Sequence, residues 1–141
     1  MNPWEIFAKR DLILVVTKDE NTGKENIMPA RWCTRCSNDP SLIAISIGLT
    51  RYTHELLERN NYFVIAVPDK NFDYKYIGSH SGRDVDKFKK EKIRTEIGKY
   101  GVPLIKDALL NIELEKYSSF QTGDHTFFIG KVLEHYISPS Y

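Results

Sequence analysis

The chain changes from an apolar strand pattern to a helix pattern within Ser41–Leu57, which reads SLIAISIGLTRYTHELL. The run Ser41–Ile47 has the length of a buried strand, and a glycine turn at Gly48 follows it. Thr50 is a favoured N-cap residue, so the pattern predicts a helix over Arg51–Asn60. The N–H groups of its first turn would be unpaired, and an arginine and a threonine would lie beside them. This junction is a candidate phosphate site, and an ordinary capped surface helix is the alternative.

A second segment, Asn26–Ser37, predicts a strand entered from a turn at Glu20–Lys24. Side chains alternate along a strand, so Asn26, Met28 and Trp32 share one face. That face offers an amide, a thioether and a broad aromatic plane, which suits a planar heteroaromatic ligand. The alternative is an amphipathic strand whose tryptophan and methionine fill the core.

Two further segments carry candidate polar residues. The pattern of Ser79–Lys90 predicts a short helix opened by Ser81 or Gly82, with Lys87 free to point away from its buried stripe. His125 lies near the start of a predicted strand. A solvated lysine and a partly buried, hydrogen-bonding histidine are the alternatives to ligand contacts.

Taken in order, these segments resemble the flavin reductase-like family, and flavoredoxins in particular, which are FMN-binding split-barrel proteins. The resemblance runs from about Asp11 to Val132. It implies one domain over residues 1–141, mainly β with a few short helices, folded as an FMN-binding split β-barrel. The matching pieces are Asn26–Trp32, Asp39-Pro40 with the apolar strand after it, Arg51–Leu56, Ser81–Phe88 and Gly123–Gly130.

The resemblance implies FMN as the cofactor and agrees with the local patterns about its contacts. It assigns flavin contacts to Asn26, Trp32, Lys87 and His125, and phosphate contacts to Thr53 with its neighbour Arg51. The predicted cofactor-binding residues are therefore Asn26, Met28, Trp32, Gly48, Arg51, Thr53, Lys87 and His125.

The chain departs from the family pattern at two positions and at its end. Family members usually carry Thr and Ser where this chain has Pro29 and Arg31. Pro29 lacks an N–H donor, and we expect Arg31 to place a charge on the strand face opposite Trp32. Relatives continue beyond the position of Tyr141 with a segment that approaches the flavin. We therefore expect weaker FMN retention or a more open active site.

Composition excludes several classes of protein. The 141 residues include 20 basic and 19 acidic side chains, so no charge bias towards nucleic acid or membranes exists. The apolar runs have strand length and no signal peptide opens the chain, so we expect a cytoplasmic protein.

The remaining pattern predicts mostly strands at short spacing, as in a closed or nearly closed barrel. In the strand Ala108–Lys116 we expect Leu110, Ile112 and Leu114 to face inward and Asn111, Glu113 and Glu115 outward. The other predicted elements are strands at Leu12–Lys18, Tyr62–Val67 and Thr126–Ile137, helical turns at Phe72–Tyr76 and Asp84–Lys90, and a polar loop from Glu91 to Pro103.

Other chemistries find little support. Cys33 and Cys36 have the spacing of a redox or zinc half-site, but residues three apart on a strand face opposite ways. We expect structural cysteines, with thiol relay or metal chemistry as the alternative. No Ser-His-Asp pattern, metalloprotease motif or dinucleotide-binding loop appears.

The expected function is that of an oxidoreductase of the flavin reductase-like type. FMN would pass reducing equivalents from NAD(P)H or a protein donor to an acceptor. Since the chain has no dinucleotide fingerprint, a nicotinamide donor would stack directly on the flavin. The resemblance also implies a homodimer with the flavin near the interface. A non-catalytic split-barrel ligand-binding protein is the alternative.

Overall fold

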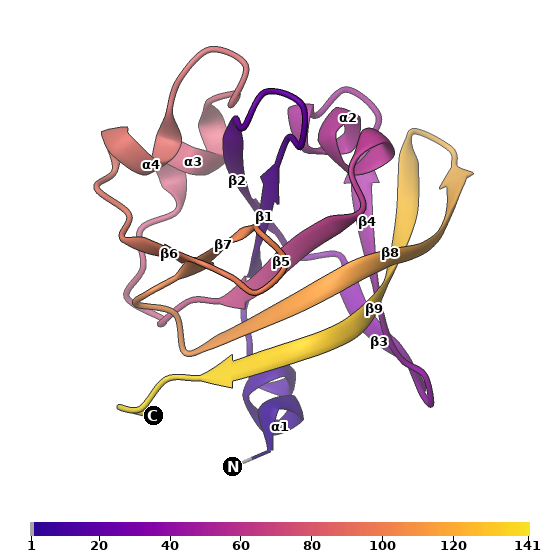
Figure 1. The fold of residues 1–141 in the computed structure, drawn as a ribbon, viewed down its shortest axis with the longest axis vertical. Helices are drawn as coiled ribbons and strands as arrows, with labels where there is room; N and C mark the ends of the chain where they lie inside the picture. The colour runs from indigo at the N-terminus through magenta and orange to yellow at the C-terminus, as the bar shows by residue number, and fades with distance from the viewer. Residues whose placement is uncertain (1) are drawn as a thin grey trace.

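The structure is a computed structural model that describes residues 2–141. A seven-stranded antiparallel sheet curls into a barrel, as the sequence predicts (Figure 1). Its strands are β1 (Ile13–Lys18), β2 (Glu25–Ala30), β3 (Cys33–Asn38), β4 (Ser41–Gly48), β5 (Tyr62–Val67), β8 (Leu110–Thr122) and β9 (His125–Ile137).

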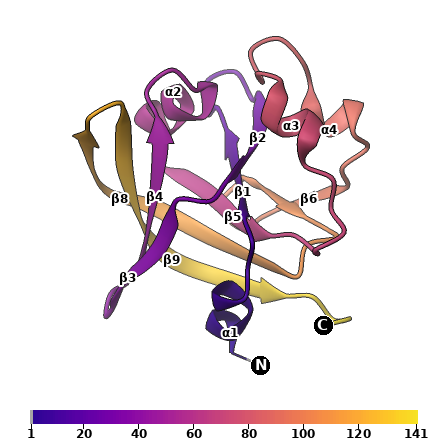
Figure 2. The same cartoon turned by 180° about the vertical axis from the view of Figure 1, so that it is seen from behind.

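Short helices and a small second sheet cover the outside of the barrel. Seen from behind, α2, α3 and α4 gather at the same end of the barrel, and α1 lies at the opposite end with both termini (Figure 2). Within residues 2–141, no helix combines the length and apolar composition needed to cross a membrane. These elements are α1 (Pro3–Ala8), α2 (Tyr52–Arg59), α3 (Lys75–Ser79), α4 (Lys87–Lys90), β6 (Thr95–Ile97) and β7 (Pro103–Ile105).

The barrel is split between two strands that are consecutive in sequence. The strand order is β2-β1-β5-β8-β9-β4-β3, so β2 and β3 form the two edges, and no ladder joins them in the described chain. The backbone N–H of Ser46 on β4 donates to the carbonyl oxygen of Trp32 at 2.9 Å. The predicted single strand over residues 26–37 is therefore wrong, because the chain leaves one edge and joins the other at residues 31–32.

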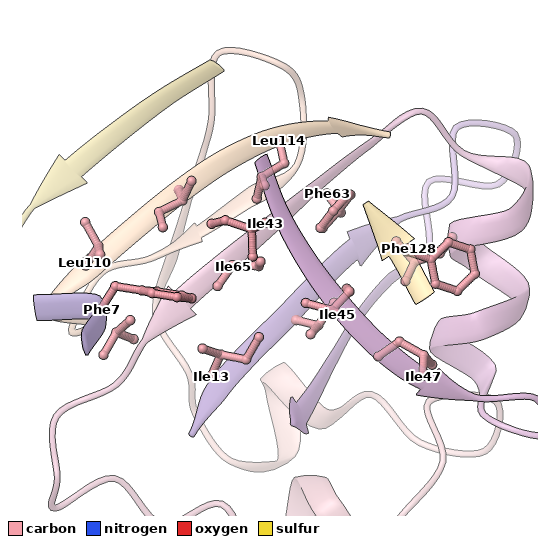
Figure 3. Close-up of a cluster of buried hydrophobic side chains, with 14 of the residues drawn as sticks. Phe7, Ile13, Ile43, Ile45, Ile47, Phe63, Ile65, Leu110, Leu114 and Phe128 are labelled. Carbon is pink, nitrogen blue, oxygen red and sulfur yellow. The ribbon is translucent and has the colours of Figure 1, made fainter. Parts of the chain in front are cut away.

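Apolar side chains fill the barrel and also cover its outer surface. Inside, Ile13 and Ile65 lie among a fully buried cluster with Ile45 and Phe63 (Figure 3). On the outer face, Leu14 and Val16 of β1 pack with residues of α3, α4 and β7. The strand β1 is thus apolar on both faces, which places α3, α4 and the second sheet against the barrel.

The strand β8 is longer than predicted and its outer face is covered. Leu110, Ile112 and Leu114 are fully buried, as expected. Asn111 and Glu113 were expected to face outward, but they are only 7% and 1% exposed. The second sheet lies over them: the Asn111 side chain exchanges two hydrogen bonds of 2.9 Å with the backbone of Ile105.

The Glu113 carboxylate holds the loop between β6 and β7 against β8. It accepts hydrogen bonds from the backbone N–H groups of Lys99 and Tyr100, at 3.3 and 3.0 Å, and from the hydroxyl of Tyr136. The hydrogen bond with Glu113 raises the pKa of Tyr136 to about 12. The predicted polar loop at Glu91–Pro103 is wrong in part, because these contacts order β6 and β7 within and beyond it.

Several predicted helix boundaries are also wrong. The helix α2 begins at Tyr52 with Arg51 as its N-cap and no side-chain cap bond, so Thr50 is not the cap. The helix near Lys87 is opened by Asp86, whose side chain accepts from the N–H of Lys89, and not by the serine or glycine upstream. The turn predicted at residues 72–76 lies three residues later, as α3, and α1 was not predicted.

We predict that Glu113→Ala lowers the free energy of unfolding by about 2–3 kcal/mol, because it leaves buried donors unpaired. Urea denaturation monitored by circular dichroism measures the loss. Glu134→Ala is the control: Glu134 lies opposite Glu113 on β9, is half-exposed and makes a single ion pair with Lys99. Equal losses in the two variants would contradict the proposed role of Glu113.

Candidate functional site

Two adjoining cavities lie between the split edge of the barrel and the helices at that end. The outer cavity, of about 480 Å³, is bounded by β2, the crossing at residues 31–32, the start of β9 and α3. The inner cavity, of about 350 Å³, lies between β2, the start of α2 and residues 77–83. Both are lined by Met28, Arg51, Gly78 and Ser79, so they form one continuous cleft.

The structure brings all eight predicted site residues to this cleft. They come from β2, the crossing, the junction of β4 with α2, the start of α4 and the start of β9. Met28 and Arg51 line both cavities, Trp32, Gly48 and His125 line the outer one, and Asn26, Thr53 and Lys87 line the inner one.

A buried polar pair forms the floor of the inner cavity. The side-chain amide of Asn26 donates to the hydroxyl of Thr53 at 2.8 Å, and the two residues are 2% and 1% exposed. The Oδ1 atom of Asn26 has no partner among the described residues. A Cβ atom at Gly82 would overlap this oxygen, so only glycine allows that loop to approach. An unpaired buried acceptor of this kind costs about 1–3 kcal/mol.

Lys87 is the second buried polar group of the inner cavity. It is 5% exposed, and its ammonium group donates to the carbonyl oxygen of Ile27 at 2.9 Å. Burial, and then the nearby charge of Arg51, lowers the pKa of Lys87 to about 8. Among residues 2–141 no carboxylate pairs with it. The alternative of a solvated lysine is therefore wrong, and a buried, unneutralised cation favours an anionic ligand.

The start of α2 offers backbone donors to the same cleft. Tyr52 and Thr53 are the first helical residues, and their N–H groups bond to no backbone carbonyl in the described chain. The exposed N-cap residue Arg51 lies beside them and lines both cavities. Unpaired amides, the positive end of a helix dipole and a guanidinium together form an anion site.

An exposed aromatic pair forms one wall of the outer cavity. The Trp32 side chain is 64% exposed, which excludes the core role considered for it. Its ring centroid lies 4.8 Å from that of His125, at an interplanar angle of 40°. The Nδ1 atom of His125 is 2.7 Å from the Asp124 carboxylate, and this contact lowers the pKa of Asp124. A flat, exposed surface beside the cavity suits stacking against a planar ligand.

Sequence reasoning did not identify a second layer of cations at the inner cavity. Arg83 lines the cavity, and its guanidinium carbon lies 5.2 Å from the ring centroid of Tyr52. The ammonium of Lys24 lies 4.9 Å from the same ring, and Arg83 also contacts Glu55 at 3.5 Å. Arg83 belongs to the segment Ser79–Lys90, but only the tertiary contact of that loop with α2 brings it to the cavity.

The two departures from the family pattern lie together at the outer cavity. Arg31 was expected on the strand face opposite Trp32, yet both line the outer cavity, because β2 ends at Ala30 before the crossing. Pro29 also lines it and packs against α3: a Cβ atom at Gly78 would lie 3.2 Å from Pro29 Cγ. Proline is tolerated here because β2 is an edge strand.

Charge is distributed asymmetrically around the cleft. Among residues 2–141, which the structure describes, no Asp or Glu lines either cavity. They contain five permanently or largely cationic side chains, which are Arg31, Arg51, Lys75, Arg83 and Lys87. The cleft can therefore hold an elongated anion with a planar part.

The cysteines lie outside the cleft. Cys33 is half-buried and Cys36 is exposed, and both are free thiols. Burial raises the pKa of Cys33, although Arg10 Nε, 3.2 Å from its sulfur, opposes this shift. No group of three or more metal-binding side chains occurs in the described part of the chain.

We predict that Lys87→Met stabilises the ligand-free protein at pH 7 by roughly 1–3 kcal/mol, because it removes a buried charge. The pKa of Lys87 is about 8 in the folded protein and near 10.5 in the unfolded chain, so the unfolded state binds more protons between these values. Wild-type stability should thus rise with pH across this window and approach that of the variant.

Urea denaturation at pH 7 and pH 10 measures both effects, with Lys90→Met, exposed on α4, as the control. A difference between wild type and Lys87→Met that stays constant with pH would argue against the buried charge as its source.

Comparison with known proteins identifies the family. A sequence model described as "Flavin reductase like domain" matches residues 9–140. A relative from Pyrococcus abyssi, itself uncharacterized, is 41% identical over 111 residues, which are 77% of this chain and 63% of the relative. This chain thus spans less than two thirds of that protein.

Solved structures share the fold. The FMN-binding protein from Thermus thermophilus with bound p-hydroxybenzaldehyde is 32% identical and has a TM-score of 0.80, over 92% of this chain and 71% of that one. The flavoredoxin of Desulfovibrio vulgaris (Miyazaki F) is 28% identical and has a TM-score of 0.83, over 93% and 71%. The chain belongs to the flavin reductase-like family, and its barrel is the split barrel of the FMN-binding members.

Proposed function

We propose that this protein binds FMN in the two-cavity cleft and passes reducing equivalents through it from a nicotinamide or protein donor to an acceptor. The observation that carries the proposal is the cleft itself, which joins a cationic, carboxylate-free lining to an exposed aromatic wall. The names of the relatives support FMN: the compared structures are an FMN-binding protein and a flavoredoxin.

The residues of the cleft fit FMN at both ends. The α2 amides, Arg51 and Thr53 would hold the phosphate, and Trp32 and Met28 would lie along the ring system. Asn26 lies at the phosphate end, because its side-chain amide donates to the hydroxyl of Thr53 at 2.8 Å.

When bound, FMN supplies the redox chemistry, because it accepts a hydride from a dihydronicotinamide and returns the electrons to an acceptor. The protein supplies position and charge. Lys87 places a positive charge beside the inner cavity, where it would help the α2 amides to hold the phosphate. His125, oriented by Asp124, would place a ring nitrogen at the outer cavity to orient the ligand or exchange a proton.

A nicotinamide donor would stack directly on the exposed face of the ring. Its approach is supported by the open outer cavity. The alternative, a binding protein without redox chemistry, draws on Pro29, which offers no N–H to a ligand in that cavity. We place the protein in the cytoplasm, for which its two free thiols give support.

We further propose a homodimer that covers the apolar surface beside the cleft. Tyr117 and Phe120 on the outer part of the β8–β9 hairpin are 57% and 54% exposed, and Trp32 and Leu49 are 64% and 40% exposed. His125 joins the two groups, because it begins β9 and pairs with Gly48 and Thr122. An exposed apolar patch next to an edge strand is typical of an interface.

We predict that Arg51→Ala weakens FMN binding by about 1.5–3 kcal/mol but leaves riboflavin affinity nearly unchanged, because only a charged phosphate contact is lost. Quenching of flavin fluorescence on titration measures both affinities. Glu58→Ala, an exposed position near the far end of α2, is the control for helix stability. Equal losses for FMN and riboflavin would mean that the phosphate lies elsewhere.

The same preparations test the redox function. Oxidation of NADH and NADPH is followed with FMN present, and turnover with either one supports a reductase. Tight FMN binding without turnover would point to an electron-transfer protein with a protein donor. No FMN binding at saturating concentration would refute the proposal and leave the ligand-binding alternative.

We predict that light scattering at micromolar concentration gives twice the chain mass of 16.4 kDa. Phe120→Glu should convert the dimer to a monomer, because it places a charge in the buried interface. Ile97→Glu is the control, since Ile97 is 61% exposed on β6, outside the hairpin. A wild-type monomer would contradict the proposal, as would a Phe120→Glu dimer of unchanged affinity.

A further inference from the structure

Arg31 contacts Tyr74 and Asp11 at the outer cavity and keeps unused donors. Its Nη2 atom donates to the hydroxyl of Tyr74 at 2.9 Å and lies 3.4 Å from Asp11 Oδ2. Its guanidinium carbon also lies 5.4 Å from the ring centroid of Tyr74. The Nε and Nη1 atoms make no hydrogen bond within residues 2–141. A guanidinium oriented in this way can accept a second partner with little loss of side-chain entropy.

The proposed FMN site leaves part of the positive charge of the outer cavity unexplained. This cavity is lined by Arg31, Arg51 and Lys75 and by no carboxylate of the described chain. The FMN phosphate would use Arg51. Asp11 is paired with Arg31 but is 77% exposed at its side chain, and such exposed pairs neutralise charge weakly. Arg31 and Lys75 therefore face the cavity as an unassigned cationic pair.

We propose that Arg31 and Lys75 bind a phosphoryl group of the nicotinamide donor while its ring lies in the outer cavity against the flavin. This inference rests on the proposed function, since it needs FMN in the cleft. In a dihydronicotinamide nucleotide, one ribose links a planar ring to a phosphate. The lining of the outer cavity has a matching arrangement, because it contains both an aromatic wall and this cationic pair. Arginine suits this role because its planar guanidinium group can donate two parallel hydrogen bonds to phosphate oxygens. Arg31 is then a specificity-determining residue for the donor.

The test compares two ligands that differ only by the phosphate. FMN-loaded protein is titrated with oxidised nicotinamide mononucleotide and with nicotinamide riboside, and the change in flavin absorbance gives each Kd. Both ligands are unable to reduce the flavin, so the readout does not depend on turnover. The variants are Arg31→Gln and Lys75→Gln. The matched control is Arg94→Gln, because Arg94 is exposed, pairs with Asp107 and lines neither cavity.

Wild type should bind the mononucleotide more tightly than the riboside. Arg31→Gln should weaken mononucleotide binding by about tenfold or more, since a charge-assisted contact is lost, and leave the riboside and FMN affinities within about twofold. Lys75→Gln should have a smaller effect in the same direction, and Arg94→Gln none. Equal affinities of wild type for the two ligands would overturn the inference. So would equal losses for both ligands, or a loss of FMN affinity, in Arg31→Gln.

Two further measurements distinguish a failure of this inference from a failure of the proposed function. Benzoate is a planar ring that carries a carboxylate and has neither ribose nor phosphate. Arg31-dependent binding of benzoate without that of the mononucleotide would overturn the phosphoryl assignment. If NADH and NADPH fail to reduce bound FMN while Arg31-dependent mononucleotide binding persists, the donor part of the proposed function fails and this site stands. If reduction occurs and Arg31→Gln changes neither mononucleotide binding nor the KM for NADH and NADPH, the function stands and this site falls. Absence of FMN binding removes both.

Discussion

The hydrogen bond from Asn26 to Thr53 ties the free edge of the barrel to the start of α2. An edge strand has unpaired backbone groups and would otherwise be exposed to solvent or to other chains. Here one buried side-chain contact fixes the distance between β2 and the helix, and the cleft is the space that remains. The amides of α2, the position of Lys87 beside Ile27 and the loop that carries Gly82 all take their places relative to this contact.

The cleft contains groups that destabilise the ligand-free protein and favour the binding of a ligand. Lys87 is buried without a carboxylate, Arg51 lies close enough to lower its pKa, and Asn26 keeps an unpaired oxygen. The two positive charges are unfavourable in the protein by itself and become favourable with a bound anion. By contrast, the acidic residue Glu113, buried beneath the loop between β6 and β7, has its donors within the chain. Lys87 is thus the buried charge that a ligand is expected to neutralise.

Local patterns predicted the barrel strands well and the tertiary details poorly. The strand at Tyr62–Val67 was predicted to the residue, because an apolar run lies there between Asn60-Asn61 and Pro68. The strands β6 and β7 have three residues each and owe their order to hydrogen bonds with the buried polar side chains of β8, which the apolar pattern does not indicate. Local patterns also failed to predict that Lys87 is buried and that Trp32 is exposed. Lysines are usually exposed and tryptophans usually buried, and here tertiary packing places each in the opposite environment.

The contact of Pro29 with Gly78 has a consequence for the rigidity of the cleft. A proline ring on an edge strand meets bare main chain of α3 here, because a Cβ atom at Gly78 would lie only 3.2 Å from Pro29 Cγ. No flexible side chain separates the two elements at this point. This part of the wall is therefore stiff, and a bound molecule must conform to its shape.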